Sequence, residues 1–272
     1  MTNHPELRHS ARAVRTWLSL VIAMVFAMVV VGGVTRLTGS GLSMVVWEPV
    51  MGIVPPIGEA EWQAVFEAYK QTPEYRLKNV GMDLAGFQAI FFWEYAHRVL
   101  GRLIGLVYAL PFAWFLFRGA FARPLAWKLG AGLALGGMQG LMGWLMVKSG
   151  LVDQPRVSHF RLAAHLGLAF LIIAWLGWIL FSLRPAPLAR RKEGLPRRLL
   201  ALVAGLTVLQ ILYGAFVAGL RAGWGYNSFP KMGDRWIADA VMALDPWWSN
   251  LLYDHASVQF LHRVLGTLLL LA

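Results

Sequence analysis

Long apolar runs separated by polar connections organise the chain. Five of these runs are long enough to cross the hydrocarbon core of a membrane, about 30 Å thick, because a helix rises about 1.5 Å per residue. A sixth run starts near Val258 and reaches Ala272, which is shorter than a span requires. The pattern predicts an all-α membrane protein that is truncated inside its sixth helix, with spans at about 17–34, 99–117, 125–147, 162–183 and 199–220.

The connection between the first two spans, residues 35–96, contains a helical pattern of its own. Trp62, Val65, Phe66 and Tyr69 recur at the spacing i, i+3, i+4 and i+7. This spacing places the four side chains on one face of a helix, as in helices that lie on a membrane surface. We therefore expect a short surface helix within this long connection.

The charges of the connections predict how the spans are oriented. The N-terminal arm and the connections at 118–128 and 184–198 together carry 12 Lys and Arg residues against 2 acidic residues. The connections at 35–96, 148–161 and 221–256 carry 10 basic and 12 acidic residues. Because basic connections face the cytoplasm, this alternation predicts a cytoplasmic N-terminus and places the second set of connections outside.

Composition agrees with a membrane protein and excludes several other classes. Hydrophobic residues make up 58% of the 272 residues and charged residues only 14%, which is too apolar for a soluble domain of this length. The net charge of +11 is explained by the basic connections that orient the spans in the membrane and by contact with anionic membrane lipid. No nucleic acid is therefore expected as a partner. The absence of cysteine excludes disulfides and thiolate metal sites. The N-terminus resembles neither a cleavable signal nor a transit peptide, which favours a bacterial inner membrane.

A sequence repeat divides the chain into two units. The pentapeptide from His97 to Gly101 recurs unchanged from His262 to Gly266, and the residues upstream match at one constant offset, namely Gly33, Pro49, Met51 and Gly52 with Gly214, Pro230, Met232 and Gly233. A duplication whose halves run in the same direction predicts two tandem four-helix transmembrane bundles related by an axis along the membrane normal. The first bundle is expected at residues 1–184, and the second, truncated bundle at 185–272. The complete protein should then have eight helices.

Two histidines within the spans are candidate metal ligands. His97 and His165 lie about 20 and about 18 residues before the cytoplasmic ends of their helices, so their imidazoles are expected at nearly one depth. Two imidazoles at one depth on different helices are typical of bis-histidine ligation of haem iron. Either histidine alone would as readily be a helix-to-helix hydrogen-bond partner. The matched depth, and the recurrence of His97 as His262, favour the ligand interpretation.

Glu94 is the candidate proton-transfer group. It precedes His97 by three residues, so the two side chains share a helix face. The second unit has Gln259 at the equivalent position. A carboxylate beside a haem suits proton transfer, and the alternative is a solvated acid that the start of the helix stabilises.

Other polar residues near the same level carry weaker signals. Arginines are candidate contacts for haem propionates, because a guanidinium matches carboxylate geometry, or they extend to the lipid headgroups. These arginines are Arg36, Arg98, Arg102 and Arg263. His159 and His255 fall in outer segments, where we expect them to be exposed or interfacial and not ligands.

Several segments resemble the haem A synthase family. They are GGVTRLTGSGLS at 32–43, EYAHR at 94–98, QGLMGW at 139–144 and HR at 262–263, and they occur in the family's order. The resemblance extends from the first span to the end of the chain. Members of the proteobacterial and mitochondrial branch have eight helices in two similar four-helix bundles, and they oxidise the C8 methyl of haem O to a formyl group by successive hydroxylations.

The resemblance implies a role for each candidate. His97 and His165 would hold the substrate haem O, and Glu94 matches the family's essential acid. His262 matches one axial ligand of a resident haem b, whose second ligand would lie beyond residue 272. The absence of cysteine excludes a mechanism based on the outer-loop cysteine pair of some members. The resemblance also implies that haem O synthase supplies the substrate, and that an electron acceptor or donor takes part.

Two other functions stay open on the residues alone. An electron-transfer cytochrome b also holds haem between two histidines of a helical bundle, but it needs no acid beside the ligand and would have ligands in both units. A transporter of parallel repeats would be expected to contain a helix broken at the midplane, whereas the ionisable residues here gather near one edge. The sequence is compatible with a monomer or an oligomer.

Overall fold

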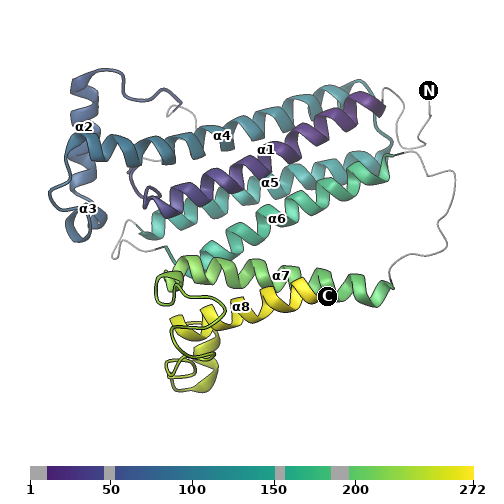
Figure 1. Ribbon diagram of the computed structural model, residues 1–272. Helices are drawn as coiled ribbons and strands as arrows, with labels where there is room; N and C mark the ends of the chain where they lie inside the picture. Colours follow the sequence, from purple (N-terminus) through teal and green to yellow (C-terminus); the bar gives the residue numbers. More distant parts are fainter. Residues whose placement is uncertain (1–10, 46–52, 151–156, 185–195) are drawn as a thin grey trace. The chain divides into compact units, whose positions relative to one another are not determined.

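The structure is a computed structural model that describes residues 11–45, 53–150, 157–184 and 196–272 (Figure 1). Within these ranges, five helices are long and apolar enough to cross a membrane. They are α1 (Ala11–Leu37), α4 (Leu84–Phe117), α5 (Arg123–Gly150), α6 (His159–Ser182) and α7 (Arg197–Leu220). The five predicted spans are thus confirmed, and the chain is a multi-pass membrane protein. The sixth apolar run forms α8 (His255–Leu271), which has 17 residues.

The chain divides into two compact units. The first contains the described residues up to 150 together with 168–184, and the second contains 157–167 and 196–272. Helix α6 therefore contributes its first part to the second unit and its remainder to the first. The predicted pair of tandem four-helix bundles, with a boundary after residue 184, stays a prediction.

Apolar side chains from four helices form the core of the first unit. Leu18 of α1, Leu125 of α5, and Leu176 and Ile179 of α6 are all buried in one cluster, together with Tyr108 of α4. The Tyr108 hydroxyl donates to the Leu129 carbonyl at 2.8 Å, which satisfies the phenol inside this core. The long apolar runs form helices here because each can cover its neighbours with one face.

A proline in α4 explains another hydrogen bond between helices. Pro111 has no N–H, so the carbonyl of Val107, four residues earlier, receives no hydrogen bond from it within the helix. The indole N–H of Trp17, on α1, donates to that carbonyl at 2.8 Å. Trp17 therefore fixes the position of α1 along α4 while it satisfies a backbone group that the proline leaves open.

Helix α4 starts 15 residues earlier than the predicted span at 99, because an outer lobe covers its first turns. The lobe contains α2 (Glu59–Lys70) and α3 (Pro73–Leu77). Phe66 and Tyr69 of α2 are buried against Phe87 and Phe91 of α4, and Asp83 caps α4 by accepting from the Gly86 N–H at 2.8 Å. The predicted helix around Trp62 is confirmed, and its apolar face packs on α4.

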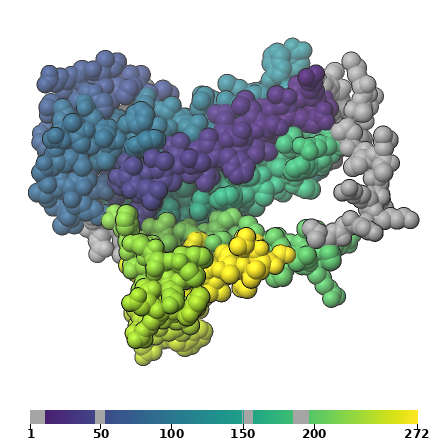
Figure 2. All heavy atoms as spheres, in the orientation of Figure 1, coloured from purple at the N-terminus to yellow at the C-terminus, as the bar shows by residue number. Residues whose placement is uncertain are grey.

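The second unit is built on α7 and α8, which pack along one another. The loop between them contains two short 3-10 helices, η1 (Ala222–Trp224) and η2 (Trp247–Leu251). Its atoms form a compact region next to α8 (Figure 2). Asp254 begins α8 by accepting from the Ser257 N–H at 2.9 Å. The first unit has the same order, with a long helix, a long loop and a helix that carries the His-Arg pair.

Candidate functional site

His97 lies against α1 at a glycine. A Cβ atom added to Gly32 would lie 3.2 Å from His97 Nε2, closer than ordinary van der Waals contact. The missing side chain of Gly32 therefore lets the imidazole approach the helix backbone. Helix α4 continues from His97 to Phe117 over about 30 Å at 1.5 Å per residue, which places this imidazole near one edge of a membrane core.

His262 has the same relation to a glycine in the second unit. A Cβ atom on Gly214 of α7 would lie 3.2 Å from His262 Cε1. The amide nitrogen of Gln210 lies 3.5 Å from His262 Nε2, and His262 Nδ1 is buried without a hydrogen-bond partner among the described residues. Each histidine of the repeated pentapeptide thus lies against a glycine of the long helix that precedes it, α1 or α7.

The helix contacts correct the register of the repeat by one residue. The sequence match pairs Gly33 with Gly214, but the glycine that faces His97 is Gly32, and no described atom outside the helix's own turns lies within 4 Å of a Cβ placed on Gly33. One turn earlier, Met28 faces Gly101 just as Gln210 faces Gly266. The other matched residues of the first unit, Pro49, Met51 and Gly52, lie outside the described residues.

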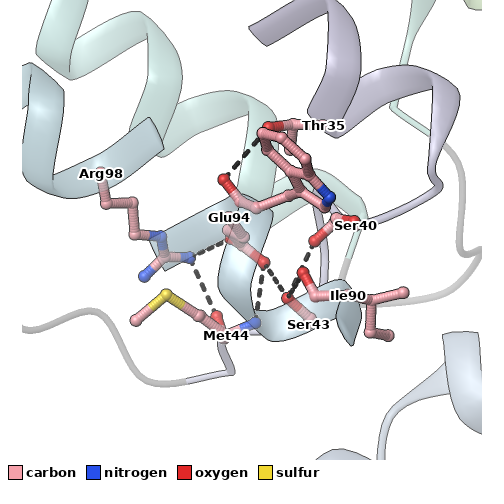
Figure 3. A network of polar contacts seen from close by, with 8 residues as sticks. Thr35, Ser40, Ser43, Met44, Ile90, Glu94 and Arg98 are labelled. Atoms are coloured by element: carbon pink, nitrogen blue, oxygen red, sulfur yellow. Dashed lines mark hydrogen bonds and ion pairs between the residues drawn. The ribbon is translucent and has the colours of Figure 1, made fainter. Parts of the chain in front are cut away.

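Glu94 is buried in a network of polar contacts (Figure 3). Its side chain is 3% exposed, and Glu94 Oε2 accepts from the Ser43 hydroxyl and from the Met44 N–H, each at 2.8 Å. Glu94 Oε1 accepts from Arg98 Nη2 at 2.5 Å, which makes a buried ion pair. The alternative of a solvated acid at a helix start is therefore wrong, because α4 begins at Leu84 and the outer loop covers Glu94.

Arg98 connects the same helix to the loop. Besides the ion pair with Glu94, its Nη2 donates to the Met44 carbonyl at 2.9 Å. The peptide groups around Met44 are thus held on both sides, by the carboxylate through N–H and by the guanidinium through C=O. Thr35 at the end of α1 adds a further contact, donating to the Trp93 carbonyl at 3.2 Å. The start of the outer loop is consequently fixed to the helix that carries His97.

The second unit has an equivalent network, in which the arginine again donates to loop carbonyls but the residue at the position of Glu94 donates instead of accepting. Gln259 donates its amide N–H to the Tyr226 carbonyl at 2.9 Å. Arg263 donates to the carbonyls of Tyr226, Ser228 and Lys231 at 2.7 to 3.0 Å. In the second unit the loop offers acceptors, whereas in the first unit it offers donors to Glu94. The difference between Glu94 and Gln259 is therefore matched by the loop that each one contacts.

The remaining candidate residues occupy different surroundings. Arg36 lies in the last turn of α1 and Arg102 further along α4. A contact of Arg36, Arg98 or Arg263 with haem propionates stays a prediction. His165 lies in the part of α6 that belongs to the second unit, whereas His97 belongs to the first. Their pairing on one iron likewise stays a prediction.

The expectation that His159 is exposed is wrong, and its place at the level of the membrane interface stays a prediction. Its side chain is buried, and its ring contacts Phe160, Phe216 and Tyr253 with centroid distances of 4.1, 5.3 and 5.5 Å. Gly219 permits this burial, since a Cβ there would lie 2.5 Å from the Cβ of His159. Aromatic neighbours of the second unit therefore bury the His159 side chain. His255, at the start of α8, is exposed as predicted.

Comparison of the sequence with other proteins identifies close relatives. The haem A synthases of Nitrosospira multiformis and of Bradyrhizobium sp. strain ORS 278 are 49% and 50% identical to it, over 94% and 100% of this chain and 72% and 75% of their own lengths. A family model described as a cytochrome oxidase assembly protein matches residues 15–272. The chain belongs to the haem A synthase family.

Membership of the haem A synthase family confirms the resemblance drawn from the sequence segments. The haem A synthase of Rhodopseudomonas palustris is a further relative, 50% identical over 94% of this chain and 70% of its own length. No solved structure matches the chain significantly. Among the described residues, no group of three or more His, Cys, Asp and Glu side chains is placed to hold a metal ion directly.

Sequence reasoning named Glu94 and Arg98 but missed their loop partners. Ser43 lies in a segment that resembles haem A synthases but shows no signal of its own, and Met44 acts through its backbone, which leaves no signal in residue type. The polar, buried character of Ser43 could have been suspected from its place directly after a glycine-rich turn.

For this haem A synthase family member, we expect Gly32→Ala to lower the haem bound at His97 and to reduce turnover about tenfold. The added methyl group would displace the imidazole by a few tenths of an ångström, and small misplacements of a reacting group are costly. Gly33→Ala is the matched control, because its Cβ would meet no atom and alanine favours the helix. Haem-to-protein ratio and haem A yield measure both. Equal behaviour of the two variants would contradict the contact.

Proposed function

We propose that this protein oxidises the C8 methyl group of haem O to a formyl group and so makes haem A for terminal oxidases. In formal balance, the methyl group and one water molecule give the formyl group, four protons and four electrons, and the electrons pass to an acceptor. Membership of the haem A synthase family supports the assignment. The observation in the structure that supports it best is the buried Glu94 carboxylate within one turn of His97.

In this proposal the substrate is bound by helices of the first predicted bundle, residues 1–184. His97 and His165 provide imidazole ligands for the iron of haem O, and Glu94 accepts or donates protons at the methyl group as it is oxidised. Gly32 leaves the space that the His97 imidazole occupies beside α1. The ion pair with Arg98 and the two loop donors hold the Glu94 carboxylate beside that ligand. Arg36 is the proposed propionate contact at the end of α1.

The second unit fits a resident haem b at His262. The His262 ring occupies the gap left by Gly214, and its Nδ1 is buried without a hydrogen-bond partner among the described residues. A buried imidazole nitrogen of this kind suits a group that ligates iron. When bound, haem b supplies one-electron redox chemistry. The chain's own residues contribute the orientation of the ring, through Gly214 and Gln210, and a loop that Arg263 holds against α8.

The proposed location is the inner membrane of a bacterium, with the N-terminus in the cytoplasm. The excess of Lys and Arg in alternate connections supports this orientation. It places Glu94, His97 and His262 near the outer face. Haem O then reaches the first unit from within the membrane, supplied by haem O synthase, and an electron acceptor takes up the electrons released.

Extraction of pigment from the purified protein tests this proposal. The protein is expressed in a host that makes haem O but has no haem A synthase of its own, and its haems are separated and measured. We expect haem O and haem A together, with haem B from the second unit. Haem B alone would show an electron-transfer cytochrome b, and a protein without haem would favour a transporter. Either result overturns the proposed function.

A further inference from the structure

The first outer loop supplies two hydrogen bonds to the candidate acid. Ser43 is 1% exposed, and its hydroxyl lies 2.8 Å from Glu94 Oε2, with the Ser40 carbonyl at 2.9 Å and the Ile90 carbonyl at 3.4 Å. A hydroxyl has one proton to donate, and the carboxylate is the strongest of these three acceptors. Ser43 therefore acts on Glu94 from a loop that is 51 residues away in sequence.

The three donors leave one carboxylate oxygen better placed than the other for a substrate. A carboxylate has about four acceptor positions, two on each oxygen. Ser43 and the Met44 N–H occupy both positions of Oε2, while Arg98 occupies one position of Oε1. Among the described residues, the position that stays open is on Oε1. The loop thus determines which oxygen of Glu94 can meet a substrate, and it prevents the carboxylate from rotating.

The second unit shows that this arrangement is particular to the first. There the residue at the position of Glu94 is Gln259, and it donates to a loop carbonyl. A loop that presents only a carbonyl to this position cannot orient a carboxylate, and a loop that presents two donors to it orients it strongly. The first loop therefore has donors where the first unit has a carboxylate, and the second loop has an acceptor where the second unit has an amide.

We propose that Ser43 is a positioning residue for the oxidation of haem O, which it serves by fixing the Glu94 carboxylate with its Oε1 toward the substrate. This inference rests on the proposed function of the first unit. It makes the outer loop, and not α4 alone, a determinant of turnover. Ser43 itself contacts neither the substrate nor the iron in this role, so its removal lowers the rate of oxidation and leaves haem O binding intact.

The test compares Ser43→Ala with wild type in the full chain, purified and loaded with haem O. We expect kcat for haem A formation to fall about tenfold, the usual loss for one hydrogen bond to a charged group, with KM for haem O and the haem O content unchanged. Ser40→Ala is the matched control. Ser40 is fully buried in the same segment, and its hydroxyl contacts the Thr38 hydroxyl at 2.6 Å. The kcat of Ser40→Ala should therefore stay within about twofold of the wild-type value.

A second variant guards against a folding defect. Ser43→Cys keeps a side chain of the same shape, somewhat larger than serine, and offers only a weak donor, so we expect accumulation in the membrane with a kcat that is again reduced. A kcat within about twofold of wild type in Ser43→Cys overturns the proposal, as does a loss of haem O content that parallels the loss of kcat. If wild type itself makes no haem A, the proposed function fails, and this outcome is distinct from a failure of Ser43 alone.

Discussion

His97→Ala is expected to abolish formation of haem A while the protein still inserts in the membrane. The imidazole is the proposed substrate ligand of the first unit, and alanine offers no atom that can bind iron. Insertion depends on the apolar spans, which the substitution leaves unchanged. His165→Ala should have the same effect, because one remaining imidazole cannot complete bis-histidine ligation. Haem A yield and membrane content of each variant, measured together, check the prediction.

His255→Ala is the control for this pair. His255 is exposed at the first residue of α8, outside both glycine-lined contacts, so its loss should leave the yield of haem A near that of wild type. His262→Ala should instead remove haem B from the purified protein and keep haem O at the first unit. A normal yield of haem A from His97→Ala or from His165→Ala contradicts the assignment of that residue as a ligand.

The spans could be predicted because the membrane imposes one simple requirement on them. A run of about 20 apolar residues must form a helix that satisfies its own backbone. The early start of α4 could not be predicted in this way. Phe87 and Phe91 precede the apolar run that predicts the span. Only their packing against Phe66 and Tyr69 explains why the helix begins at Leu84.

The candidate ligands could be predicted, but their surroundings could not. His97 and His262 are visible because ionisable residues are rare in spans and because the pentapeptide repeats. Gly32 faces His97, whereas the sequence match pairs Gly33 with Gly214, since a match of residue types does not determine which side of a helix faces its neighbour. The burial of His159 depends on Phe216 and Tyr253, which belong to other elements of the second unit.

The environment of Glu94 shows the same limit most clearly. Its spacing from His97 follows from helix geometry, which the sequence contains. Its partners Ser43 and Met44 come from a loop whose path no local pattern describes. Arg98 is four residues away on the same helix, so the ion pair could have been predicted from spacing, whereas the residue type alone left a propionate and a lipid headgroup as its two open partners.

We expect Glu94→Gln to bind haem O with an unchanged bis-histidine spectrum and to stall before haem A, with a rate lower than that of wild type by about 100-fold or more. The amide has nearly the size of the carboxylate, and its oxygen can still accept from Ser43 and Met44. It cannot carry a proton between the substrate and solvent. The His97 ring is placed by Gly32 on the neighbouring helix, so its position should survive the change.

Loss of the charge also weakens the fold, and this effect must be separated from catalysis. Removing one partner of a buried ion pair costs about 3 to 5 kcal/mol of stability, because Arg98 keeps its charge without a counterion. Glu74→Gln is the matched control. Glu74 is another buried carboxylate of the first unit, 5% exposed in α3, where the Tyr69 hydroxyl lies 3.5 Å away. This variant should lose stability and keep its rate of conversion per molecule of bound haem O.

The double variant Ser43→Ala with Glu94→Gln decides whether the carboxylate is the group through which the loop acts. If Ser43 works only by orienting Glu94, its removal should cost nothing further once the carboxylate is gone, so the double variant should match Glu94→Gln alone. Independent roles would instead multiply the two losses of rate. Wild-type rates in Glu94→Gln would leave the carboxylate as an anchor for Met44 and Arg98, and the difference between the two units would then depend on residues other than Glu94 and Gln259.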